Sequence, residues 1–142
     1  MSDEKRLEVA DRLHSAAIHL LRTAAKTDTQ SGLGPARLSA LSVLVFGGAK
    51  TLGQLAAAER VKPPTMSRIV AGLKQSGLAK VQNDGQDARK ITISVTAKGE
   101  RLLQEARKRR IQVLAENLKK LSEADLKTLS KAAGLIEKML HS

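Results

Sequence analysis

The chain of 142 residues contains no cysteine, tryptophan or tyrosine, and Phe46 is its only aromatic residue. The lack of cysteine excludes disulfides, thiolate metal sites and thiol-based redox sensing. The lack of aromatic side chains argues against binding of single-stranded DNA or RNA, which uses aromatic platforms for base stacking. No segment is apolar over the length that a membrane span or a signal peptide needs, so we expect a cytoplasmic protein without a membrane partner.

Acidic residues are also scarce. Asp and Glu total 14 against 25 Lys and Arg, which gives a formal net charge of +11. The excess is concentrated in residues 60–110, which carry thirteen basic and four acidic side chains, whereas residues 1–59 and 111–142 are each close to neutral. DNA releases condensed counterions when cationic side chains contact its phosphates, so it is the natural partner of such a segment. The alternative interpretation is a basic surface that serves only to keep the protein soluble.

Apolar periodicity and capping residues predict a mainly α (α+β) chain. Thr51 and Gln54 form a capping-box pattern, Pro64 suits the first position of a helix, and Thr96 and Ser122 can cap two further helices. Asp84-Gly85 is a hairpin signal between two strands. The predicted helices cover residues 5–28, a segment closed by Gly47-Gly48, a segment from Thr51, about 64–76, about 97–121, and a segment from Ser122; the predicted strands lie near 78–82 and 91–95.

Residues 51–96 follow the order helix, turn, helix and hairpin, which predicts a winged helix-turn-helix with a two-stranded β wing. Ala56 is small where the two helices of the motif cross, and Met66 and Ile69 anchor the second helix. Arg60 stands in the turn, at a position where such motifs often carry glycine.

The exposed tip of the second helix carries side chains suited to duplex DNA. Hydroxyl groups can bond phosphates or base edges, and an arginine can bridge a guanine. Asp87 can hold the guanidinium of Arg89 by a short salt bridge and aim it into a narrow minor groove. An ordinary surface helix with hydroxyls for local capping is the alternative. The candidate DNA-binding residues are Lys62, Pro64, Thr65, Ser67, Arg68, Lys74, Asp87, Arg89 and Lys90.

From about Leu38 to Leu103 the chain resembles the MarR family of bacterial winged-helix regulators. The matching stretches are Thr51–Ala56, Pro64–Val70, Leu73–Leu78 and Asp87–Gly99. The resemblance implies a homodimer on pseudo-palindromic operator DNA, with recognition helices in major grooves and wings in the flanking minor grooves. It also implies a repressor released by a small molecule, often an anionic phenolic compound, bound between the DNA-binding lobe and the dimerisation helices.

An effector pocket in this chain would be aliphatic, because only one aromatic residue is available. Leu20 and Phe46 are the candidate lining residues, and a chain without any ligand fits the composition as well. The apolar stripes of the terminal helices exceed what one small core can bury, which favours a dimer over helices packed back on their own chain. We expect one domain over 1–142, with a winged helix-turn-helix lobe over 35–99 and dimerisation helices over 5–28 and 100–142.

The sequence shows no arrangement of residues that predicts metal binding or catalysis. His14 and His19 are five apart on one helix and cannot chelate one metal ion together, so neither a metal nor another cofactor is expected. The basic run Arg107–Arg110 is interpreted as a solvated collar around its helix. No nucleophile and base are paired, so an enzyme is not expected. The competing functions are a sequence-tolerant architectural DNA-binding protein and an effector-binding module that has lost DNA binding.

Overall fold

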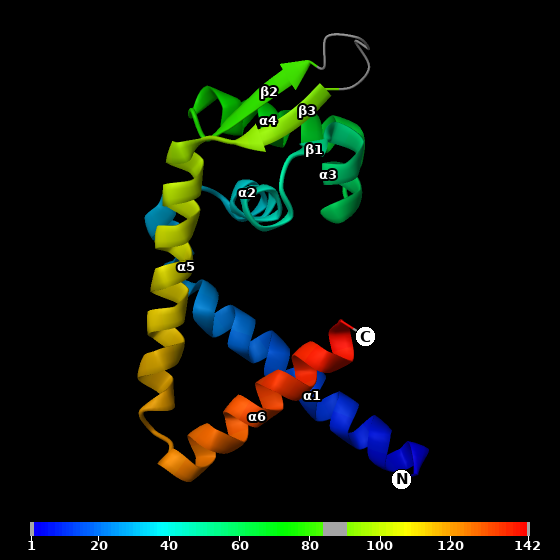
Figure 1. Ribbon diagram of the computed structural model, residues 1–142, viewed down its shortest axis with the longest axis vertical. Coiled ribbons are helices and arrows are strands. Elements are labelled where there is room, and N and C mark those ends of the chain that lie inside the picture. The colour runs from blue at the N-terminus through cyan, green and yellow to red at the C-terminus, as the bar shows by residue number, and fades with distance from the viewer. Residues whose placement is uncertain (1, 84–90, 142) are drawn as a thin grey trace. The chain divides into compact units, whose positions relative to one another are not determined.

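The computed structural model describes residues 2–83 and 91–141, and all structural statements refer to this part of the chain. The elements of the chain, drawn in Figure 1, are α1 (Asp3–Ala24), the 3-10 helix η1 (Ala25–Ser31), α2 (Pro35–Gly47), β1 (Lys50–Thr51), α3 (Leu52–Ala58), α4 (Pro63–Gln75), β2 (Ala79–Asn83), β3 (Ile91–Val95), α5 (Ala97–Leu118) and α6 (Glu123–Leu140).

Two helices end three or more residues earlier than predicted. The first helix ends at Ala24 and continues as the 3-10 helix η1, because residues 25–28 (Ala-Lys-Thr-Asp) add no further large apolar side chain to its stripe. The helix from Ala97 ends at Leu118, three residues earlier than predicted, and the turn after it is closed by the backbone bonds of residues 119–121.

The sheet has three antiparallel strands in the order β1-β3-β2. The predicted two-stranded wing is present as β2 paired with β3, and β1 adds a third strand that the sequence did not indicate. β1 pairs with β3 through Lys50 opposite Ile93, and β2 pairs with β3 through Val81 opposite Ile93. A strand of two residues has no periodicity of its own, and only its pairing with β3 defines it.

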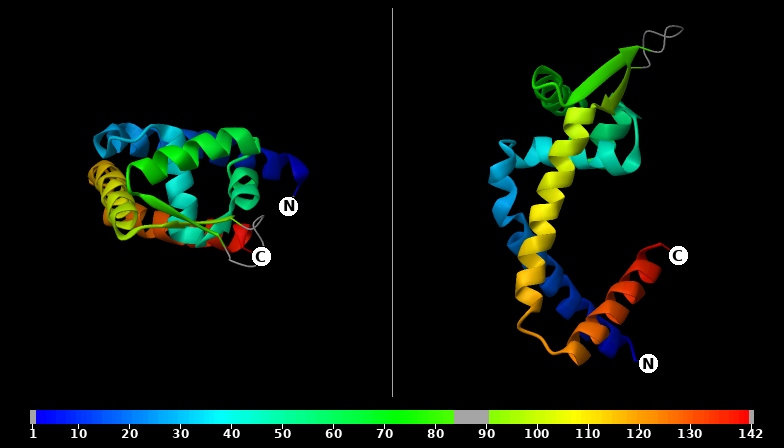
Figure 2. Two further views of the ribbon diagram at one scale, coloured as in Figure 1. Left: turned by 90° about the horizontal axis from the view of Figure 1, so that it is seen from above. Right: turned by 60° about the vertical axis from the view of Figure 1, so that its left-hand side comes forward.

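The chain divides into two compact units, one formed by Ala25–Arg110 and the other by Met1–Ala24 with Ile111–Ser142. In the first unit α2 contacts both α4 and β3, and the view from above in Figure 2 shows α2 between α4 and the β2–β3 pair. The largest fully buried side chains of this unit are Leu41, Leu44, Leu55, Met66, Leu73, Leu78 and Ile93.

The second unit contrasts with this core, because its helices bury almost nothing within the described chain. α6 contains no buried residue, and in α1 only Ala24 is buried. Large apolar side chains are exposed instead, among them Leu7 at 70%, Leu129 at 46% and Leu140 at 68%.

Candidate nucleic-acid interface

The recognition helix α4 begins at two prolines. Lys62 is its N-cap in extended conformation, and Pro63 and Pro64 occupy the first two helical positions. Pro63 rather than Pro64 is therefore the first residue of the helix; its fixed φ suits that position. Prolines have no N–H, so two of the donors that a helix N-terminus usually offers to an anion are missing here.

The two faces of α4 differ sharply in burial. Met66, Val70 and Leu73 are buried at helical spacing, and Ile69 is half-buried beside them. All six candidate DNA-binding residues of this helix and its turn are exposed, namely Lys62, Pro64, Thr65, Ser67, Arg68 and Lys74. The burial of one face fixes which side chains of the other face are presented to a partner.

The turn before α4 holds the two helices of the motif together. Leu55 and Ala56 of α3 are buried, and the N–H of Val61 donates to the carbonyl of Ala56 at 3.0 Å. Arg60 has φ 55°, in the left-handed region that favours glycine. Position 60, which is often glycine in such motifs, therefore has the left-handed backbone conformation in this chain.

A second set of bonds fixes the end of α4 and the start of the wing to α5. The hydroxyl of Thr96 donates to the carbonyl of Gly77 at 2.7 Å, and Lys98 Nζ donates to the carbonyl of Ser76 at 3.0 Å. Gly99 lies so close to Leu78 that a Cβ at position 99 would be 2.2 Å from the Leu78 carbonyl oxygen. We call residues 76–78 with 96–99 the wing junction. The contacts of the wing junction require the hydroxyl of Thr96 and the missing side chain of Gly99, and both residues belong to a stretch that resembles the MarR family.

The wing itself is built by β2 and β3. Ile93 is buried, Val95 is half-buried and Ile91 is exposed, so the predicted apolar face of the second strand is buried mainly toward its C-terminal end. The predicted wing residues Asp87, Arg89 and Lys90 lie outside the described residues.

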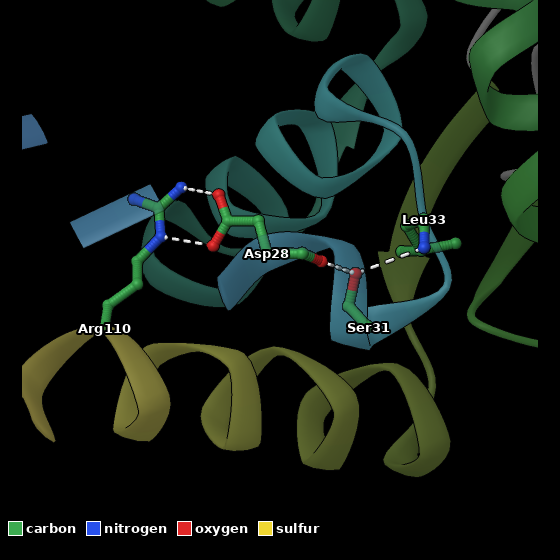
Figure 3. A network of polar contacts seen from close by, with 4 residues as sticks. All are labelled: Asp28, Ser31, Leu33 and Arg110. Atoms are coloured by element: carbon green, nitrogen blue, oxygen red, sulfur yellow. Dashed lines mark hydrogen bonds and ion pairs between the residues drawn. The ribbon is translucent and has the colours of Figure 1, made fainter. Parts of the chain in front are cut away.

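An ion pair that sequence reasoning missed joins η1 to α5. Arg110 Nε donates to Asp28 Oδ1 at 2.8 Å, and Arg110 Nη2 donates to Asp28 Oδ2 (Figure 3). Ser31 Oγ donates to the Asp28 carbonyl at 2.7 Å and accepts from the N–H of Leu33 at 3.1 Å. The hydrogen bond to Asp28 raises the pKa of Arg110 above its ordinary value, against the opposing effect of partial burial.

This pair corrects the interpretation of Arg107–Arg110 as a solvated collar. Arg107 and Lys108 are exposed, but Arg109 and Arg110 are half-buried, and Arg109 Nε has no hydrogen-bond partner among the described residues. Asp28 and Arg110 are 82 residues apart, so no local pattern indicates their pairing.

The candidate pocket residues lie in different units. Leu20 of α1 is 56% exposed, and Phe46 of α2 is 61% exposed. Within residues 2–83 and 91–141, no three histidine or carboxylate side chains are placed to hold a metal ion, and no helix is apolar over the length of a membrane span.

Fold and interface together define a winged helix-turn-helix protein. The MarR family model matches residues 31–90. An HTH-type transcriptional regulator of Mycobacterium leprae is 36% identical over 95 residues, which cover 67% of this chain and 66% of that protein. The chain thus spans just under two thirds of the length of the curated relatives that it matches.

Solved structures share the fold over 90% or more of the chain. A MarR family protein from Bacillus stearothermophilus has a TM-score of 0.81 at 21% identity, covering 100% of this chain and 99% of that one. NadR in complex with 4-hydroxyphenylacetate has a TM-score of 0.65 at 18% identity, covering 90% and 91%. The chain belongs to the MarR family. The family and its curated members are transcriptional regulators, which confirms the prediction that the chain is not an enzyme.

Proposed function

We propose that the chain is a sequence-specific regulator of transcription that binds double-stranded DNA as a homodimer and is a repressor released by a small molecule. The observation that carries the proposal is the division of α4 into a buried face and an exposed face with hydroxyl and arginine side chains. Met66, Val70 and Leu73 hold the helix on the core. Thr65, Ser67 and Arg68 are left exposed in its first two turns.

The charge distribution supports DNA as the partner. Nearly all of the excess positive charge of the chain lies in residues 60–110, the segment that contains the turn, α4 and the wing. Lys62 and Lys74 suit phosphate contacts at the two ends of α4. On the strength of the sequence pattern, we assign Arg89 of the wing to the minor groove and Asp87 to orienting it. We assign Lys90 to the neighbouring DNA backbone.

The exposed apolar surface of α1 and α6 supports the homodimer. Leu13 and Leu21 of α1 and Leu129 and Leu140 of α6 are exposed in the single chain, although such residues are usually covered in a folded protein. A twofold-symmetric partner presents the same surface and covers it. Two copies place two recognition helices on one duplex, which requires a pseudo-palindromic operator.

Structural similarity to a protein that binds a small molecule supports the proposed effector. NadR, which shares the fold, was crystallised with 4-hydroxyphenylacetate. On the strength of the sequence, Leu20 and Phe46 remain our candidates for lining an aliphatic pocket in this chain.

Selection of bound sequences from random duplex DNA at physiological salt tests the proposal. We expect one enriched motif with two half-sites about 10 base pairs apart, or a multiple of that spacing, because a dimer contacts successive turns of one face. Binding without enrichment would replace sequence-specific regulation by architectural DNA binding. No binding at all would leave an effector-binding module.

A further inference from the structure

Arg37 lies on the recognition helix although it belongs to another element. It is the third residue of α2, and its guanidinium covers Gly72 of α4. A Cβ at position 72 would be 2.5 Å from Arg37 Cζ and 2.6 Å from both Nε and Nη2. The three distances are nearly equal, so the guanidinium lies face-on over the glycine. Its N–H groups, which lie in the plane, therefore extend along the surface of α4.

No hydrogen bond or ion pair in the described part of the chain uses these donors, and Arg37 is exposed. Gly72, by contrast, is buried, and the side chain of Arg37 covers it. The guanidinium thus takes the place that a side chain at position 72 would occupy, with its charge unpaired.

That place is one edge of the exposed face of α4. Position 72 is seven residues after Thr65 and four after Arg68, so all three share one side of the helix. Lys74 is two residues after Gly72 and points about 160° away from it around the helix axis. Arg37 and Lys74 therefore lie along opposite edges of the face that carries Arg68.

Cations along both edges of α4 suit a helix that lies in the major groove of DNA. The groove is about 12 Å wide and an α-helix with its side chains is about 10–12 Å across, so a phosphate backbone runs along each edge of the helix. Lys74 supplies a cation for one backbone. α4 itself has a glycine at the other edge, and Arg37 supplies the missing cation from α2.

We propose that Arg37 is a phosphate-contacting residue that completes the recognition surface of α4, and that Gly72 is required to seat it. The inference rests on the proposed binding of duplex DNA. A guanidinium held flat on a glycine has lost part of its rotational freedom before DNA arrives, and it offers two parallel N–H donors to one phosphate. Such a contact strengthens binding to every sequence equally.

The test measures affinity for two duplexes, the sequence selected from random DNA and an unrelated one, over a range of salt concentrations. Arg37→Gln should weaken binding to both by the same factor, about tenfold for loss of a charged hydrogen bond, and should lower the salt slope by about one. Lys108→Gln removes the same charge from an exposed position on α5 and is the matched control. We expect the control to change affinity by less than about threefold, the effect of net charge alone.

Gly72→Ala tests the seat separately. Alanine favours a helix over glycine, so the unfolding midpoint should stay the same or rise, while the added Cβ displaces the guanidinium. DNA binding should then weaken as in Arg37→Gln, and the double variant should be no weaker than Arg37→Gln alone.

Three results would overturn the inference. Arg37→Gln could match Lys108→Gln, which would leave Arg37 as a surface charge. The loss could be confined to the selected sequence, which would make Arg37 a base contact instead. The losses of Arg37→Gln and Gly72→Ala could add fully, so that Gly72 acts independently of Arg37. If the wild-type protein binds neither duplex, the proposed function itself fails, and that outcome is distinct from these three.

Discussion

Arg60 holds a left-handed backbone conformation, with φ 55°, at the turn between α3 and α4. A residue with a Cβ loses about 1 kcal/mol or more in this conformation, and glycine avoids that loss at some cost in the entropy of the unfolded chain. Arg60→Gly should therefore increase the free energy of unfolding by about 0.5 kcal/mol, measured by urea denaturation. Arg60→Ala keeps the strain and removes the same charge, so it should give no increase. A destabilised glycine variant would show that the arginine side chain makes a compensating contact.

Arg68 is the residue of α4 best suited to read a base, because it is exposed one turn into the helix and can donate two parallel bonds to guanine. Arg68→Ala should cost about 1–3 kcal/mol on the selected DNA sequence and relax the preference at one position. Titration against the selected and an unrelated duplex at one salt concentration measures the difference. Arg101→Ala, an exposed arginine on α5, serves as the control. An equal loss on both duplexes would reassign Arg68 to a phosphate.

At the scale of elements, the wing junction determines how α5 follows the wing. A Cβ on Gly99 would lie 2.2 Å from the Leu78 carbonyl oxygen and 2.8 Å from Val95 Cγ2, and the first of these is backbone that cannot turn aside. Gly99→Ala should destabilise the protein by about 2 kcal/mol or more, measured by thermal or urea unfolding. Gly53→Ala is the matched control, because nothing lies within 4 Å of its added Cβ in α3. Equal stability of the two variants would mean that α5 can shift away from β2 without loss.

The sequence predicts the end of an element well where capping residues or a glycine mark that end. Thr51 and Gln54 form the predicted capping box, with bonds of 3.2 and 3.0 Å, and Ser122 caps α6 through the N–H of Asp125. Gly77, predicted to end α4, has φ 74°. These features depend on residues within four positions of one another, and such patterns can be recognised before the fold is known.

Features that depend on distant residues could not be predicted in this way. β1 is a strand only because Lys50 and Thr51 pair with β3, some forty residues away. The Asp28–Arg110 pair and the placement of Arg37 over Gly72 likewise join separate elements. The exposed face of α4 was predictable because helical periodicity alone determines it, whereas the cation along its second edge comes from α2.

At the scale of the whole molecule, the exposed apolar residues of the terminal helices predict the oligomeric state. The wild-type protein should sediment as a dimer at micromolar concentration, and its unfolding midpoint should rise with protein concentration. Leu129→Asp buries a charge in the proposed interface and should give monomers or insoluble protein. Lys131→Asp places the same residue on the opposite side of α6 and should leave the dimer intact. A wild-type monomer would contradict the proposal, as would a dimer unaffected by Leu129→Asp.

The lack of any buried residue in α6, all of which the structure describes, also bears on how the cell regulates the amount of this protein. A helix without a buried residue gains little stability from packing, so α6 of an isolated chain should open readily. Proteases and chaperones act on such open segments. Chains that have not found a partner should therefore be degraded faster than dimers, and the form that survives would be the one with two recognition helices.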